Sequence, residues 1–88
     1  MKIIKTVEEV SGEGMLALIG QRVTIFCAAY IYTGELIGVN DTCVKLRDAS
    51  IVYETGDFNT KTWKDAQKLP YDWYVSTGMI ESFGILKS

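Results

Sequence analysis

The sequence is poor in the residues that catalytic sites, metal sites and disulfide scaffolds require. It has no histidine, and its two cysteines, Cys27 and Cys43, each lie inside an apolar run. Without histidine neither thiol has its usual general base, and a reduced cysteine in such a run behaves as a small hydrophobic residue. Two cysteines in this setting indicate neither a disulfide framework nor a zinc site. The sequence also has no glycine-rich phosphate loop or carboxylate cluster, so we predict no enzymatic activity, no cofactor and no metal.

The sequence also lacks an excess of positive charge and a long apolar run. Its formal net charge is -2, so no overall basic field attracts nucleic acid, and any anion binding must use a local patch. The opening stretch MKIIKTVEEV carries Glu8 and Glu9 after a few apolar residues. It is too short and too charged for a signal peptide or a membrane span. We therefore expect a cytoplasmic protein without membrane contact.

The length of 88 residues leaves room for one small hydrophobic core. Because a core of this size buries a modest share of the chain's surface, association with further subunits would add useful burial. We expect one domain over residues 1–88. Its parts are an N-terminal segment with a helix, three strands, an enlarged loop and two final strands (residues 1–21, 22–55, 56–70 and 71–88).

The first half of the chain predicts a helical turn and two strands. Residues 14–20, GMLALIG, form a short apolar segment bounded by glycines, which is typical of a short helix ending at Gly20. Apolar residues alternate with others over residues 22–32, and this period of two predicts a first strand. Residues 34–39 predict a second strand with glycines at points of close approach. Residues 40–42, Asn-Asp-Thr, predict a tight turn, since Asn and Asp side chains bond their own backbone.

The second half of the chain predicts three further strands. Residues 43–55 favour a long third strand that bulges around residues 48–50. Residues 71–77 and 79–86 favour two more strands that meet at Gly78. Five strands after a short helix, with glycine kinks, predict an all-β fold in the form of a small, strongly bent, partly open barrel.

The enlarged loop at residues 56–70 contains a stretch of helical character. A helix over residues 60–69 would be capped by Asn59 or Thr60 and ended by Pro70, the single proline. Three lysines would then share its exposed face: Lys61, Lys64 and Lys68. Repeated around an oligomer, they would offer positive charge to a phosphate backbone. The alternative is a solvated face that keeps the loop soluble.

Two stretches of the sequence carry a resemblance to a known family. In LIGQRVTIF, Gly20 is followed by alternating apolar residues at Val23 and Ile25. In GELIGVNDTCVKL, the predicted second strand ends at a polar residue, and the third strand begins soon after it; the matching positions are Gly34, Leu36, Val39, Asn40, Cys43, Val44 and Leu46. STGMIESF has two apolar residues three apart, Ile80 and Phe83. These stretches resemble the two signatures of the Sm-like (Sm/LSm) family, which includes the bacterial RNA chaperone Hfq. The resemblance covers residues 14–55 and 71–86.

The resemblance implies a ring-shaped homo-oligomer. In Sm-like proteins the fourth strand of one subunit pairs with the fifth strand of its neighbour, and we expect about five to seven subunits on this basis. The residues of the last strand also favour pairing between subunits, because MIESFGIL has no proline or internal lysine to discourage edge pairing. The alternative is a monomer in which the N-terminal segment covers the final strand.

The resemblance also implies RNA-binding residues at two turns. In Sm-like proteins the turns after the second and fourth strands converge at the pore, where an aromatic side chain stacks a base and polar and basic side chains contact it. The matching positions here are Asn40, Asp41, Thr42, Thr77 and Gly78. Asn40 stands where the family prefers Asp, Thr42 where an aromatic residue is usual, and Thr77 and Gly78 where basic residues are usual. The alternative is that Asn40 and Asp41 only form the turn.

Two tyrosines add a possible stacking surface. Tyr30 and Tyr32 lie at the end of the predicted first strand, where their rings could stack bases. We expect the other aromatic side chains to serve the core or a subunit interface.

Two function classes follow. The first is a ring-forming Sm-like protein that binds single-stranded RNA, or DNA in its place, in RNA processing, pairing or turnover. The second is a ring-shaped structural or protein-interaction scaffold, of a kind a phage could encode, that binds no nucleic acid. Since a fold hosts many functions, the RNA hypothesis depends on the family resemblance.

Overall fold

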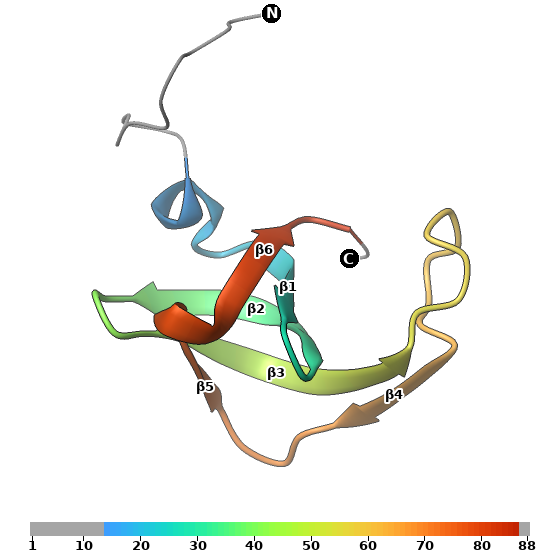
Figure 1. Ribbon diagram of the computed structural model, residues 1–88. Coiled ribbons are helices and arrows are strands. Elements are labelled where there is room, and N and C mark those ends of the chain that lie inside the picture. Colours follow the sequence, from blue (N-terminus) through green and yellow to red (C-terminus); the bar gives the residue numbers. More distant parts are fainter. Residues whose placement is uncertain (1–13, 87–88) are drawn as a thin grey trace, which may run out of the picture.

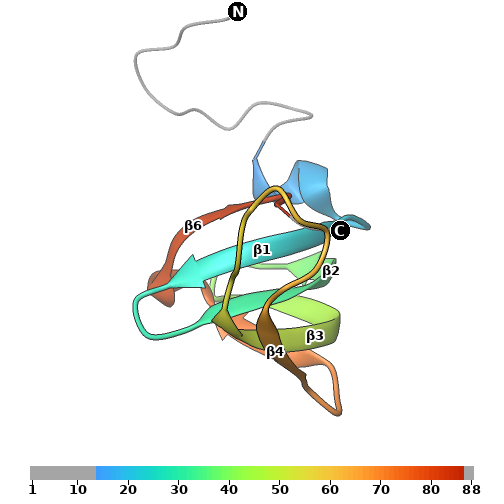
Figure 2. The same cartoon turned by 90° about the vertical axis from the view of Figure 1, so that its right-hand side faces the viewer.

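The computed structural model describes residues 14–86, which form one antiparallel β-sheet (Figure 1). Its six strands are β1 (Arg22–Cys27), β2 (Ile31–Val39), β3 (Cys43–Glu54), β4 (Asp65–Lys68), β5 (Trp73–Ser76) and β6 (Ile80–Gly84). The strand order is β4-β3-β2-β1-β6, and β5 also pairs with β3. Figures 1 and 2 show a strongly curved sheet, with β1 and β6 on one side and β3, β4 and β5 on the other.

The predicted N-terminal helix is a single 3-10 turn, η1 (Met15–Leu18). Gly20 follows it with a φ of +89°, a left-handed conformation that favours glycine, and so ends the turn as predicted. A second 3-10 turn, η2 (Thr77–Met79), joins β5 to β6 around Gly78. The described residues contain no α-helix, and none of their helices is long and apolar enough to cross a membrane.

The core lies on the inner face of the curved sheet. Its buried side chains alternate along β1, β2 and β3 as the period of two predicts, with a contribution from β5: Val23, Ile25, Leu36, Val44, Leu46, Ala49 and Val75. Half-buried residues pack against this core from η1, from the connection between β4 and β5, and from the start of β6; they include Met15, Leu18, Leu69 and Ile80. The small size of this group agrees with the single small core expected from the chain length.

The bulge predicted at residues 48–50 is present in β3. The β2–β3 register shifts between Thr33 and Glu35, which pair with Ser50 and Arg47. Asp48 lies in this interval with a φ of 51°, in the left-handed region that Asp tolerates better than most residues. The bulge bends β3, and the two halves of the strand pair with different partners on their outer edge.

The prediction of a single first strand over residues 22–32 is wrong. The chain turns at residues 28–30, where the amide of Cys27 donates a hydrogen bond to the carbonyl oxygen of Tyr30 (3.0 Å). Tyr32 therefore belongs to β2, where it pairs with Ile25 of β1. Two small alanines precede Tyr30 and allow a tight reversal, while the alternation of side chains continues across it, so the period of two gave no sign of the turn.

The prediction of a helix over residues 60–69 is also wrong. Residues 65–68 form β4, which pairs with the C-terminal half of β3 from Ser50 to Glu54. The amide of Leu69 continues this pairing by donating to the carbonyl oxygen of Ala49 (2.8 Å). Because β3 extends well beyond β5, its edge presents backbone donors and acceptors, and pairing with them outweighs a weak local helix preference. β4 and β5 thus behave as one interrupted strand along β3.

The predicted five-stranded barrel is an open sheet of six strands in the described part of the chain. β6 pairs with β1 at one edge, while β4 and β5 lie along the other edge on β3. The predicted fourth and fifth strands correspond to β5 and β6. The alternative in which the N-terminal segment covers the last strand concerns residues 1–13, which lie outside the described residues.

Candidate nucleic-acid interface

The two turns that the family resemblance singles out lie against one another. The amide of Thr77 donates to the carbonyl oxygen of Thr42 (2.9 Å), and the Thr77 hydroxyl donates to the carbonyl oxygen of Asp41 (3.0 Å). The pairing of Cys43 with Ser76 brings β3 and β5 together just before these contacts. Residues 40–42 and 77–78, far apart in sequence, therefore form one exposed surface at this end of the sheet.

Asn40 shapes the first of these turns. Its Oδ1 accepts hydrogen bonds from the amide of Thr42 (2.8 Å), the hydroxyl of Thr42 (3.0 Å) and the amide of Cys43 (2.9 Å). Its own amide donates to the carbonyl oxygen of Cys43 (3.0 Å). The side-chain oxygen is thus committed to the turn, and its amide nitrogen is the group that can still contact a ligand.

Lys45, which was not among the predicted site residues, places a cation near this surface. Lys45 of β3 pairs in register with Tyr74 of β5, and its Nζ lies 5.4 Å from the Tyr74 ring centroid. A hydrogen bond with Tyr74 is the main cause that raises the pKa of Lys45, and the charge of Asp72, whose carboxylate is 3.7 Å away, adds to it. The sequence does not show which residues of β3 and β5 pair, so the contact between Lys45 and Tyr74 could not be predicted from it.

Tyr30 and Tyr32 lie at a small cavity on the β5 side of the molecule. Their ring centroids are 6.3 Å apart with an interplanar angle of 58°. The cavity, called here the tyrosine cavity, measures about 150 Å³ and is lined by Cys27, Tyr30, Tyr32, Tyr74, Val75 and Met79 among others. Tyr30 is exposed and Tyr32 half-buried, and burial raises the pKa of the Tyr32 hydroxyl. The two predicted stackers are therefore brought together, next to β5.

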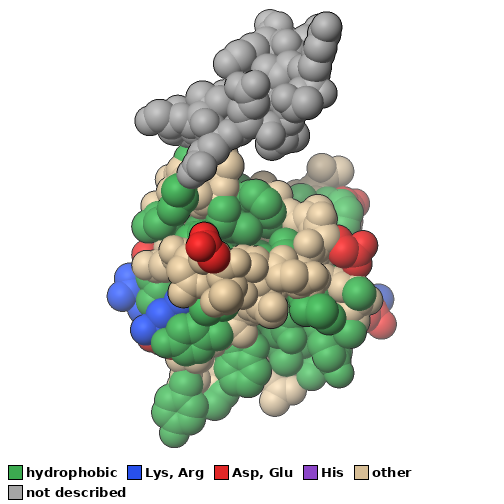
Figure 3. Space-filling view, turned by 60° about the vertical axis from the view of Figure 1, so that its left-hand side comes forward, with side chains coloured by type: hydrophobic (Ala, Val, Ile, Leu, Met, Phe, Trp, Pro, Cys, Tyr) green, Lys and Arg blue, Asp and Glu red, His purple; other side chains and the backbone are tan. Residues whose placement is uncertain are grey.

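Apolar side chains are exposed on both edge strands and the turn that joins them. Tyr71, Trp73 and Tyr74 lie at β5, and Met79, Phe83 and Ile85 lie at β6. Figure 3 shows the face that comes forward on this side, where apolar side chains gather in its lower half. Exposed apolar groups at a sheet edge are typical of a surface that pairs with another chain.

The three predicted lysines do not share a helical face. Lys64 pairs with Glu54 (3.3 Å between Nζ and Oε2), and Lys68 pairs with Asp48 (3.7 Å between Nζ and Oδ1). Because residues 65–68 are extended, Lys68 lies along β3 while Lys61 lies in the preceding loop. The predicted circle of positive charge is therefore reduced to Lys61 and a partly neutralised Lys64.

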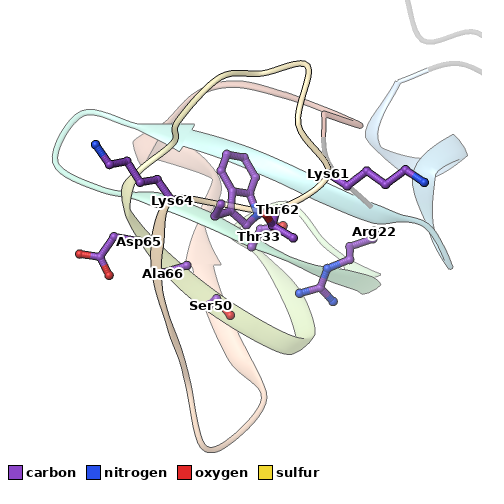
Figure 4. Close-up of a pocket in the computed structure, with 9 residues that line it drawn as sticks. Arg22, Thr33, Ser50, Lys61, Thr62, Lys64, Asp65 and Ala66 are labelled. Carbon is purple, nitrogen blue, oxygen red and sulfur yellow. The ribbon is translucent and has the colours of Figure 1, made fainter.

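A larger cavity lies between β1, β2, β3 and the segment that leads into β4 (Figure 4). This basic cavity measures about 370 Å³, and its lining includes Arg22, Thr33, Ser50, Lys61, Trp63 and Lys64. Arg22 was not among the predicted site residues, because it lies 39 positions from Lys61 and the sequence does not show where the loop that carries Lys61 lies. Its guanidinium Nη2 donates to the carbonyl oxygen of Asp48 (2.9 Å).

Comparison with known proteins adds no relative to this geometry. No protein-family model matches the sequence, and no curated protein is significantly similar to it.

Proposed function

We propose that this chain is an Sm-like protein that assembles into a ring of about five to seven copies and binds single-stranded RNA, in RNA processing, pairing or turnover. The observation that carries the proposal is the open sheet, in which the edge strands β5 and β6 expose the apolar side chains of Trp73, Tyr74 and Phe83. Single-stranded DNA is a variant of the same proposal.

The edges support assembly through their positions in the sheet. β5 pairs with β3 and β6 pairs with β1, so the two strands occupy opposite ends of the sheet order in residues 14–86. When β5 of one copy pairs with β6 of the next, each copy uses two different surfaces, and repetition with rotation closes a ring. Trp73 and Phe83, 37% and 41% exposed, would become buried in this contact.

The converging turns support nucleic-acid binding near the ring axis. Residues 40–42 and 77–78 form one exposed surface close to β5, and a ring repeats it once per copy. The amide nitrogen of Asn40 can contact a base edge, and the tyrosine cavity next to β5 offers rings on which a base can stack.

The assembly is tested by light scattering on purified protein after size exclusion. We expect a ring-sized mass, and a shift to monomer when a charge is placed on either edge by Phe83→Lys or Trp73→Lys. Phe58→Lys is the matched control, since Phe58 is 52% exposed but lies in the loop before β4. A monomeric wild-type protein at micromolar concentration would contradict the ring.

Nucleic-acid binding is tested with labelled U-rich, A-rich and mixed strands of RNA and DNA at low and moderate salt. We expect binding that weakens as salt rises, because phosphate contacts release counterions. Asn40→Ala and Thr77→Val are expected to weaken binding if the converging turns form the site. Binding that does not change with salt, or no binding to any strand, would contradict the nucleic-acid proposal. The ring would still be tested separately by light scattering.

A second candidate function, a ring-shaped scaffold without nucleic acid, is favoured by one observation. The Oδ1 atom of Asn40 is committed to the turn, and Asp41 is the one charged residue in positions 40–42 and 77–79. A surface of this kind repels phosphate rather than attracting it. An assembled ring that binds none of the strands would support the scaffold.

A further inference from the structure

We propose that the basic cavity binds one nucleotide, with its phosphate held by Arg22 and Lys61 and its base against Trp63. The proposal rests on the proposed function for the class of ligand, and it adds a second contact site away from the converging turns.

The pairing of charges singles out Arg22 and Lys61. Within residues 14–86, every other lysine or arginine lies near a carboxylate oxygen: Lys45 and Lys68 at 3.7 Å, Arg47 at 2.8 Å and Lys64 at 3.3 Å. Among these described residues, neither Arg22 nor Lys61 forms an ion pair with a carboxylate, and both line the basic cavity. In the described part of this acidic chain, the two cations without a carboxylate partner therefore lie at one cavity, whose opposite side carries Asp65.

The contact of Arg22 orients its guanidinium without neutralising it. Its Nη2 donates to the main-chain carbonyl oxygen of Asp48 (2.9 Å), while the Asp48 carboxylate faces Lys68 instead. A guanidinium has five N–H donors in a planar fork, so the remaining N–H groups can donate hydrogen bonds to two oxygens of one phosphate. Arg22 also lies at the start of β1 and is half-buried, which limits its rotamers.

The lining suits the rest of a nucleotide. Figure 4 shows Arg22 and Lys61 on one side of the cavity, with Lys64 and Asp65 on the opposite side. The half-buried indole of Trp63 also lines the cavity, where an aromatic ring can stack a base. Thr33 and Ser50, which pair in register, also line the cavity. Thr33 is 1% exposed and its hydroxyl donates to the carbonyl oxygen of Val23 (3.0 Å), so Ser50 supplies the hydroxyl group that a ligand can reach.

The size of the cavity also agrees with a ligand of this class. Its volume of about 370 Å³ falls within the roughly 300–1,000 Å³ that is usual for small-molecule sites. The tyrosine cavity, at about 150 Å³, is smaller and lacks a cation in its lining.

The experiment titrates the purified full-length chain with AMP, UMP, adenosine and inorganic phosphate, and with short A-rich and U-rich RNA strands. Trp63 and Trp73 are the two tryptophans, so a Trp73→Phe background makes Trp63 the fluorescent reporter. We expect AMP to quench the Trp63 fluorescence and inorganic phosphate to compete with AMP for the cavity. Adenosine, which has no phosphate, should bind at least about tenfold more weakly than AMP.

Charge-removing variants locate the binding. Arg22→Gln and Lys61→Gln are each expected to weaken AMP binding about tenfold, and Arg22→Lys to restore part of the loss at Arg22. Lys68→Gln is the matched control, because Lys68 is paired with Asp48 outside the cavity, and it should bind as the wild type does. If Arg22→Gln unfolds the protein, Lys61→Gln in the exposed loop still decides the question.

The outcomes separate this inference from the proposed function. Binding of AMP that is unchanged in Lys61→Gln and Arg22→Gln, or no binding at millimolar AMP in low salt, overturns the inference. If RNA strands bind and depend on Asn40 and Thr77 alone, the inference fails and the proposed function stands. If AMP binds at the cavity but no ring forms, the inference stands and the proposed ring fails. Tighter binding of strands than of AMP identifies the ligand as a nucleotide within a strand, and the opposite order identifies a free nucleotide.

Discussion

The hydroxyl of Thr77 donates a hydrogen bond across the sheet to the main-chain carbonyl oxygen of Asp41, 3.0 Å away. This contact ties the β2–β3 turn to the β5–β6 turn, and the amide of Thr77 reinforces it through the carbonyl oxygen of Thr42 (2.9 Å). The two turns come from opposite halves of the chain, and Thr77 supplies two hydrogen bonds that join them.

We predict that Thr77→Val lowers the free energy of unfolding by about 0.5–1.5 kcal/mol, since it removes one hydrogen bond and keeps the side-chain shape. Thr77→Ser retains the hydroxyl and should lie close to the wild type. Urea unfolding at one fixed protein concentration measures both values, because assembly would make stability depend on concentration. Equal stabilities of the Val and Ser variants would mean that the hydroxyl does not hold the turns together.

Asn40→Ala is expected to destabilise the protein by about 1–2 kcal/mol. The substitution removes the oxygen that accepts three hydrogen bonds from Thr42 and Cys43, and water replaces it in part because the turn is exposed. Asn40→Asp keeps an acceptor oxygen in place and should cost less. Thermal unfolding followed by circular dichroism ranks the three proteins, and an Asp variant as unstable as the Ala variant would contradict this account of the turn.

Gly34→Ala should destabilise the fold by about 1–3 kcal/mol, the cost typical of overpacking. A Cβ at Gly34 would lie 3.1 Å from the Ala49 Cα and 3.1 Å from the Arg47 carbonyl oxygen, and both are main-chain atoms of the bulged part of β3. Gly38→Ala is the matched control in the same strand, since its nearest contact would be an ordinary 3.8 Å to the Lys45 Cβ. Chemical unfolding of the two variants should give clearly different midpoints, and similar midpoints would show that β3 can move away from Gly34.

The thiol of Cys27 should ionise at a higher pH in the folded protein than in the unfolded chain. Burial is the main cause that raises its pKa, and the nearby charge of Glu81 adds to it, since both disfavour the thiolate. In a Cys43→Ser background, the rate of alkylation by iodoacetamide against pH gives the midpoint, and the same protein in urea gives the reference. Glu81→Gln should lower the native midpoint only in part. A native midpoint at or below that of the unfolded chain would contradict the prediction.

Local patterns predicted much of this fold because the deciding interactions lie close in sequence. The glycine at position 20 ends its turn, the Asn-Asp-Thr turn forms where the residue types demand, and Asp48 marks the bulge. Residues 28–30 and 65–68 were predicted wrongly for opposite reasons. The first turn uses alanines, which carry no turn signal, and β4 is extended because β3 offers it a partner, which no local pattern reveals.

The candidate sites divide in the same way. The meeting of residues 40–42 with Thr77 follows the family resemblance, because the turn positions could be aligned along the sequence. The basic cavity could not be predicted, since it needs Arg22 of β1 and Lys61 at one cavity, and this depends on the path of the loop before β4. The pairing of Lys64 and Lys68 with carboxylates likewise depends on the β3–β4 register.

The pairing of β6 with β1 has a consequence for how the chain folds. β1, β2, β3 and β4 pair with their neighbours in sequence, whereas β6 joins β1 through pairs such as Thr24 with Gly84. Closing so long a loop carries the largest entropic cost in the sheet, so β6 is expected to dock last. Until it docks, β1 presents an open edge that β6 of another copy can occupy equally well. Dilution during refolding should therefore favour subunits that keep their own β6 over strand-exchanged dimers, in which β1 of each copy pairs with β6 of the other.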